Sequence, residues 1–114
     1  AAATILANWA QEQVLPVHLI CGMRSGKDAR QFLAELAGHV VSVCTVPIPD
    51  EPACVAPETL CETARAVGVD HAKPAQSVVD ALRAITEDIG KKPVCVLIAG
   101  SLYLAGAVLA EGEQ

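Results

Sequence analysis

The sequence predicts an α/β domain: a three-layer, Rossmann-like arrangement with a mainly parallel sheet between two layers of helices. Short apolar segments alternate with longer segments of helical periodicity along the whole chain. Such alternation is typical of βαβ units with right-handed crossovers. The strand segments are also apolar at successive positions, as in residues 94–99. Strands of this kind are buried on both faces, which favours a parallel sheet.

The first half of the chain predicts helices at residues 2–13 and 28–37 and strands at 16–21 and 40–46. The first strand ends at Gly22. Gly38 is expected to end the second helix as a left-handed cap. The side chains expected to face inward are Ile5, Leu6, Trp9 and Ala10 in the first helix and Phe32, Leu33 and Leu36 in the second.

In the second half, three prolines between residues 47 and 52 fix φ and predict a rigid loop. Pro57 opens a third helix that closes at Gly68, and residues 69–73 form a short strand. A capping box of Ser77 and Asp80 begins a fourth helix, which ends at Gly90. Strand 94–99 follows. The turn at Gly100 and an N-cap at Ser101 then predict a last helix, with Leu104, Ala105, Val108 and Leu109 as its apolar positions.

Composition excludes several classes of protein. At 114 residues, with 53% hydrophobic residues and a mean hydropathy of +0.42, the chain is expected to be one folded domain. No apolar run approaches the roughly 20 residues that span a membrane, and no leader pattern is present at the start. A net charge of −5 argues against nucleic acid and anionic membranes as partners. Five cysteines without zinc spacing predict free thiols and a cytoplasmic location.

If the strands are parallel, their carboxyl ends meet at one end of the sheet, where open α/β sheets bind ligands. The loops expected there are 22–28, 45–50, 73–76 and 100–103, and they bring together Arg24, Ser25, Lys27, Asp28, Lys73, Ser101 and Tyr103. Lys27 suits a carboxylate or phosphate as a point cation. Ser101 would add a hydroxyl and the N–H groups of a helix N-terminus. Asp28 would complement the dipole of the helix that it precedes.

Other kinds of site are not indicated. The turn 22–28 has three residues between its glycines, where a phosphate loop has four, and Asp28 stands where that loop needs Ser or Thr. We therefore expect the chain alone to bind Mg-ATP weakly at most. No histidine has a metal-ligand partner at the usual spacing, and Gly100-Ser101 lacks the second glycine of a nucleophile elbow. No catalytic residue and no metal site are assigned.

Four blocks of sequence resemble one enzyme family. They are Gly22-Met23…Lys27-Asp28, Val46-Pro47…Pro49, Ser77…Ala81-Leu82 and Ile-Ala-Gly-Ser-Leu-Tyr-Leu-Ala-Gly at residues 98–106. Their order and spacing resemble the C-terminal lobe of folylpolyglutamate synthase/dihydrofolate synthase, ATP-dependent amide ligases of the Mur ligase superfamily that serve folate biosynthesis and one-carbon metabolism. Such enzymes convert a carboxylate of dihydropteroate or folyl(poly)glutamate to an acyl phosphate, which the amine of L-glutamate then attacks.

The resemblance implies that residues 1–114 are one lobe of a larger ligase, without its first strand and its central ATPase domain. ATP and Mg²⁺ would bind in that other domain, and the isolated lobe would be inactive. Lys27 and Ser101 fall on the positions that hold the carboxylates of the incoming amino acid, and Asp28 and Tyr103 flank them as further substrate-binding candidates. The chain departs from the family at Asp50-Glu51, where many members carry an arginine.

Two other functions stay open on sequence alone. A stand-alone doubly wound domain that binds a small ligand would need a Ser/Thr-rich phosphate turn or an acidic cluster at the strand ends. A structural dimerisation domain would need no charged groups there. An Asp-Gly-Ala-His-Asn run upstream of Ala1, with a nucleotide loop further back, would decide for the ligase.

Overall fold

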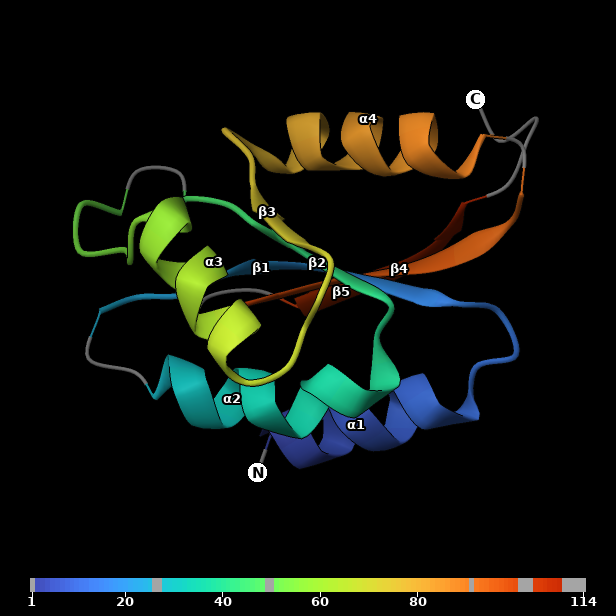
Figure 1. The fold of residues 1–114 in the computed structure, drawn as a ribbon, viewed down its shortest axis with the longest axis horizontal. Coiled ribbons are helices and arrows are strands. Elements are labelled where there is room, and N and C mark those ends of the chain that lie inside the picture. The colour runs from blue at the N-terminus through green and yellow to red at the C-terminus, as the bar shows by residue number, and fades with distance from the viewer. Residues whose placement is uncertain (1, 26–27, 49–50, 91, 101–103, 110–114) are drawn as a thin grey trace.

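The protein folds as a five-stranded sheet between helices, as the computed structural model shows for residues 2–25, 28–48, 51–90, 92–100 and 104–109 (Figure 1). The helices are α1 (Ala2–Glu12), α2 (Ala29–Leu36), α3 (Pro57–Ala66) and α4 (Val78–Ile89), with a 3₁₀ turn at Ala37–His39. The strands are β1 (Val17–Gly22), β2 (Ser42–Thr45), β3 (Ala72–Pro74), β4 (Val94–Gly100) and β5 (Leu104–Leu109).

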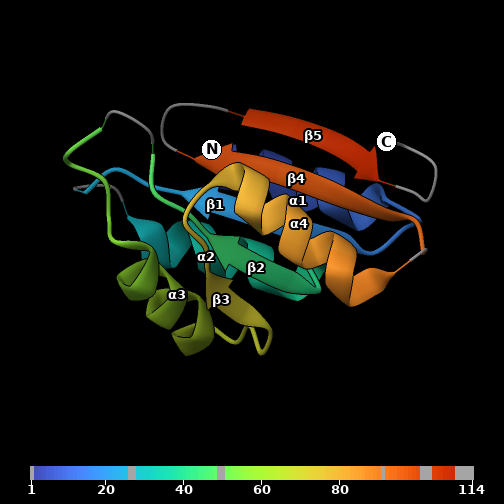
Figure 2. The same ribbon diagram turned by 90° about the horizontal axis from the view of Figure 1, so that it is seen from above.

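The strand order is β3-β2-β1-β4-β5, and Figure 2 shows the strands side by side in this order. The pairs β3–β2, β2–β1 and β1–β4 are parallel, whereas β5 runs antiparallel to β4. Helices α1, α2 and α3 cover one face of the sheet and α4 covers the other (Figure 1). The prediction of a three-layer α/β domain with a mainly parallel sheet is therefore confirmed.

Each face of the sheet has its own apolar core, because successive residues of a strand point to opposite faces. Leu19 and Cys21 of β1 face α1, α2 and α3, whereas Ile20 between them faces α4. All three side chains are completely buried. Burial on both faces is what the unbroken apolar strand segments predicted.

The last predicted helix is wrong. Residues Leu104–Leu109 are strand β5, which pairs with β4 from Ala99↔Leu104 to Val94↔Leu109. The apolar spacing fitted a helix, but Gly106 weakens a helix interior by about 1 kcal/mol. Pairing with β4 also satisfies a whole row of backbone hydrogen bonds along that strand. Gly100 ends β4, paired with Gly22, and is not a turn into a helix.

Two smaller expectations are also wrong. Gly38 lies inside the 3₁₀ turn, and among the described glycines only Gly68 and Gly90 have positive φ, at 109° and 65°. Gly38 is therefore not a left-handed cap. Ile5 is 68% exposed, because the buried side of α1 is centred on Leu6, Ala7 and Ala10 instead.

The helix boundaries largely agree with the prediction. Pro57 is the first residue of α3, and Ser77 caps α4 by accepting a hydrogen bond from the Asp80 backbone N–H at 3.1 Å. Strand β3 starts at Ala72, later than expected, because the chain first turns through Gly68 and residues 69–71. The inward residues of α2 and α4 are placed as predicted, with Leu33, Leu36, Ala81 and Ile85 buried.

Candidate functional site

The carboxyl ends of the parallel strands meet at one end of the sheet, as the candidate site requires. Gly22 of β1 pairs with Gly100 of β4, and Thr45 of β2 pairs with Cys21 on one side and with Pro74 on the other. The four loops expected at this carboxyl end of the sheet therefore do start from neighbouring strand ends. Lys27, Ser101 and Tyr103 themselves lie outside the described residues.

Asp28 has a definite structural role. It is the N-cap of α2, and its Oδ1 accepts a hydrogen bond from the backbone N–H of Gln31 at 3.0 Å. An N-cap carboxylate satisfies a free N–H group and interacts favourably with the helix dipole. The expectation that Asp28 complements the start of this helix is confirmed, whereas its contact with a substrate stays a prediction.

The turn after β1 is joined to the proline-rich loop after β2. The Ser25 N–H donates to the Ala53 carbonyl oxygen at 2.6 Å, and the Val55 N–H donates to the Met23 carbonyl oxygen at 2.8 Å. Arg24 Nε lies 3.4 Å from Glu51 Oε2, so an ion pair adds to these backbone bonds. The two loops therefore form one connected wall at the carboxyl end of the sheet.

Thr45 connects the same wall to the helix behind it. Its side chain is fully buried, and it is the one buried polar side chain in the part of the chain that the structure describes. The Oγ1 hydroxyl donates a hydrogen bond to the Pro57 carbonyl oxygen at 2.7 Å, in the first turn of α3. The Ala75 N–H donates to the Thr45 carbonyl oxygen at 2.8 Å. Thr45 thus holds the ends of β2, β3 and α3 together.

Lys73 does not belong to the carboxyl-end group in which its sequence position placed it. Its Nζ lies 3.1 Å from Asp88 Oδ2, near the last turn of α4. Because α4 runs back across the sheet, its last turn lies at the amino end of the parallel strands (Figure 1). The backbone of Lys73 pairs with Cys44, one residue before the end of β2, and its long side chain extends to the carboxylate of Asp88.

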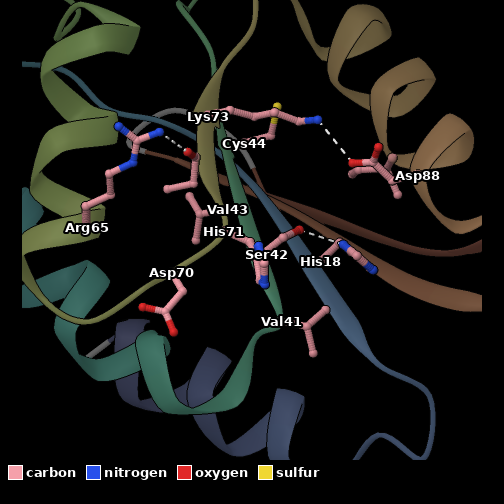
Figure 3. Close-up of a pocket in the computed structure, with 12 residues that line it drawn as sticks. His18, Val41, Ser42, Val43, Cys44, Arg65, Asp70, His71, Lys73 and Asp88 are labelled. Carbon is pink, nitrogen blue, oxygen red and sulfur yellow. Dashed lines mark hydrogen bonds and ion pairs between the residues drawn. The ribbon is translucent and has the colours of Figure 1, made fainter.

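A cavity of about 610 Å³ lies beside this ion pair, between β2, β3 and α4 (Figure 3). His18 of β1 and Ser42 of β2 also line it, and His18 Nδ1 lies 2.6 Å from Ser42 Oγ. The two residues are register partners in the sheet. Burial lowers the pKa of His18, and the nearby carboxylate of Asp88 opposes that shift in part.

One feature of the sequence indicates this cavity. His18 and Ser42 are polar residues at strand positions where the neighbouring residues are apolar. On strand alternation, both share the α4 face with Ile20 and Cys44. Their contact was not predictable, because it needs the register between β1 and β2.

All five cysteines are free thiols in the structure. Burial raises the pKa of Cys21 to about 12 and also raises the pKa of Cys44. Within the described ranges, no three His, Cys, Asp or Glu side chains are grouped so that they could hold a metal ion. None of the described helices is long and apolar enough to cross a membrane.

Comparison with known proteins supports the assignment of the fold. No protein-family model matches the sequence, and no curated protein matches it. Two solved structures are similar to the chain: Mycobacterium tuberculosis folylpolyglutamate synthase complexed with ADP, and the same enzyme complexed with ADP and AMPPCP. Each has 24% identity and a TM-score of 0.67 over 76% of this chain.

The chain spans about a fifth of the length of these enzymes, since the match covers 20% of theirs. At this identity the likeness shows a shared fold. It agrees with the family that the sequence motifs resemble.

Proposed function

We propose that this chain is a C-terminal lobe of an ATP-dependent amide ligase that adds L-glutamate to dihydropteroate or folyl(poly)glutamate. The fold shared with folylpolyglutamate synthase is the observation that carries the proposal. The independent likeness of four sequence blocks to the same family supports it.

The role proposed for the lobe is to hold the incoming glutamate. Ser101 directly follows Gly100, and Lys27 follows Gly22 by five positions, while Gly22 and Gly100 are partners at the carboxyl end of the sheet. An ammonium group and a hydroxyl are suitable donors for a carboxylate. Binding its carboxylates there would leave the glutamate amine to attack the activated acyl group, with phosphate as the leaving group.

The ATP and Mg²⁺ that such a ligase uses do not fit this chain. The turn after β1 has the wrong glycine spacing for a phosphate loop and lacks its hydroxyl residue. In addition, its backbone at Ser25 is already bonded to Ala53 of the proline-rich loop. We therefore assign nucleotide binding to another domain of the full-length enzyme, and we propose a cytoplasmic location in keeping with the free thiols.

The test is steady-state kinetics of the full-length enzyme with Lys27→Ala and Ser101→Ala. Loss of a charge-assisted contact typically costs about 1.5–3 kcal/mol, so the KM for glutamate should rise roughly 10- to 100-fold for Lys27→Ala. The KM for ATP should be nearly unchanged. Lys92→Ala is the matched control, because Lys92 is an exposed lysine that precedes β4 at the amino end of the sheet.

Wild-type glutamate kinetics in both variants would show that neither residue holds glutamate. An equal rise in the KM for glutamate in Lys92→Ala would show a general charge effect. Either result removes the proposed glutamate site. Absence of any glutamate-dependent ligase activity in the full-length protein would refute the proposed function itself.

A further inference from the structure

The two edges of the sheet differ in how far they are open to another strand. β3 and β5 stand at the two ends of the strand order, so each is an edge strand of the described sheet. The outer side of an edge strand is a row of backbone N–H and C=O groups that can pair with another chain. Figure 2 shows β5 as the outermost of the described elements on its side of the sheet.

The edge at β3 is short and blocked. The Val43 N–H donates to the His71 carbonyl oxygen at 2.9 Å, so that oxygen faces β2. Because backbone groups alternate in direction along a strand, those of Ala72 and Pro74 face the outer edge. The Ala72 carbonyl oxygen already accepts a hydrogen bond from Arg65 Nη2 at 2.7 Å, and Pro74 has no N–H to donate. Little of this edge is therefore left for another strand.

The edge at β5 is longer and carries none of these protective features. β5 has six residues, and none of them is charged or a proline. Its pairing with β4 is uninterrupted from Leu104 to Leu109, so β5 contains no bulge either. Charged residues, prolines and bulges are the usual means by which an edge strand is kept from pairing with another chain. The β5 edge is therefore open to a further strand.

Three residues of β5 direct their backbone groups to this open edge. The Cys95 N–H donates to the Pro16 carbonyl oxygen at 2.9 Å, so the backbone groups of Cys95 face β1 and not β5. Cys95 is the register partner of Val108, which makes them a non-hydrogen-bonded pair, and the N–H and C=O of Val108 face outward. Alternation along the strand gives Gly106 and Leu104 the same outward direction.

The sequence of β5 reads nearly the same by size in both directions around Gly106, as Leu104-Ala105-Gly106-Ala107-Val108. In an antiparallel pair, two residues directly opposite each other either both bond across the pair or both bond away from it. Gly106 opposite Gly106 of a second copy satisfies this condition. Leu104 then lies opposite Val108 of the second copy, and the two alanines lie opposite each other. A glycine inside a strand is also typical of a place where another backbone approaches closely.

We propose that two copies of the chain associate through β5, antiparallel to each other, with Gly106 on the two-fold axis. The outward N–H and C=O groups of Leu104, Gly106 and Val108 would bond across the axis and join the two sheets into one. A two-fold interface needs a surface that is complementary to itself, and here each copy supplies both the donors and the acceptors. The net charge of −5 on each copy opposes association, but none of that charge lies on β5.

The test is sedimentation equilibrium of the 114-residue chain, with amide hydrogen exchange followed by NMR to locate the contact. We expect a reversible dimer with a Kd of roughly 10 μM, because the contact of one strand pair is smaller than a standard interface. At a chain concentration of about 1 mM, the Gly106 amide should exchange slowly because the second copy pairs with it. The Ala107 amide should exchange slowly at every concentration, because Ala107 pairs with Val96 of β4.

Val108→Pro removes an outward N–H and leaves the pairing with β4 in place, since edge strands accept proline where the N–H faces away from the sheet. Each dimer would lose one hydrogen bond from each copy, so the Kd should rise about fivefold or more. The Gly106 amide should then exchange faster, while slow exchange of the Ala107 amide shows that β5 is intact. Val108→Thr is the matched control, because threonine is also β-branched and keeps the N–H.

Four outcomes would overturn the proposal. They are a monomer at every concentration up to about 1 mM, a Kd that Val108→Pro leaves unchanged, an equal loss of association in Val108→Thr, or fast exchange of the Gly106 amide in the wild-type dimer. The last two would mean that the dimer forms through side chains or through another surface. None of these measurements depends on ligase activity, so the dimer and the proposed function succeed or fail separately.

Discussion

Replacing Thr45 by Val tests whether one buried hydroxyl holds the wall of the candidate site. The two side chains have nearly the same shape, so the change substitutes a methyl group for Oγ1 and removes its 2.7 Å hydrogen bond to the Pro57 carbonyl oxygen. A net hydrogen bond contributes about 0.5–1.5 kcal/mol, and a buried acceptor left without its donor adds to the cost. We expect the free energy of unfolding to fall by about 1–2 kcal/mol.

The matched control is Thr63→Val. Thr63 Oγ1 also donates to a backbone carbonyl, that of Thr59, at 3.1 Å, but this hydrogen bond is exposed and the residue is only partly buried. Exposed substitutions of this kind usually change stability by less than about 0.5 kcal/mol. The assay is urea unfolding of the 114-residue chain, followed by circular dichroism and by the fluorescence of Trp9, the single tryptophan.

A loss in Thr45→Val no larger than the loss in Thr63→Val would refute the reasoning, because it would mean that the buried bond adds nothing beyond an exposed one. A changed slope of the urea transition would point instead to an altered denatured or native state.

Two further predictions concern titratable groups. Burial lowers the pKa of His18 from 6.5, so as the pH falls through 6.5 the unfolded chain binds a proton that the folded chain does not. The free energy of unfolding should therefore be highest above this pH and fall below it. His18→Asn should reduce the dependence of the unfolding free energy on pH in this range. An unchanged dependence would contradict the prediction. Thiol reagents at mildly alkaline pH should modify the partly exposed Cys54 first and leave Cys21, with its pKa of about 12, unmodified until the chain unfolds. Peptide mapping of the labelled native protein checks this, and early labelling of Cys21 would count against the buried position of β1.

The strands that form the centre of the sheet were predictable because the apolar residues of each segment alone indicate that it is buried. β1 and β4 are apolar at almost every position, and few arrangements other than a parallel sheet covered on both faces bury such strands. Helices α3 and α4 were predictable for a similar reason, since Pro57 and Ser77 mark their first turns.

β5 was not predictable by the same reasoning. Leucine, alanine and valine at residues 104–109 fit a helical face as well as a strand, and the choice depends on β4, a partner elsewhere in the chain. The contacts in the wall of the candidate site could not be predicted either, because they also depend on partners elsewhere in the chain. Neither the Arg24–Glu51 pair nor the bond from Ser25 to Ala53 follows from any local pattern, because the partners are more than 25 residues apart in sequence.

The change from a helix to a strand after residue 103 alters what Ser101 is able to contribute. A helix beginning there would have supplied several free N–H groups and a dipole worth about 0.3–1 kcal/mol toward an anion. Strand β5 has no comparable dipole, and its N–H groups are spread along the strand, half of them paired with β4, instead of converging at its start. Ser101 would then act on a carboxylate mainly through its hydroxyl, whereas Lys27 would act through a full charge. If the lobe holds glutamate as proposed, Lys27→Ala should raise the KM for glutamate more than Ser101→Ala does. The opposite order would mean that the loop at Ser101 provides backbone donors of its own.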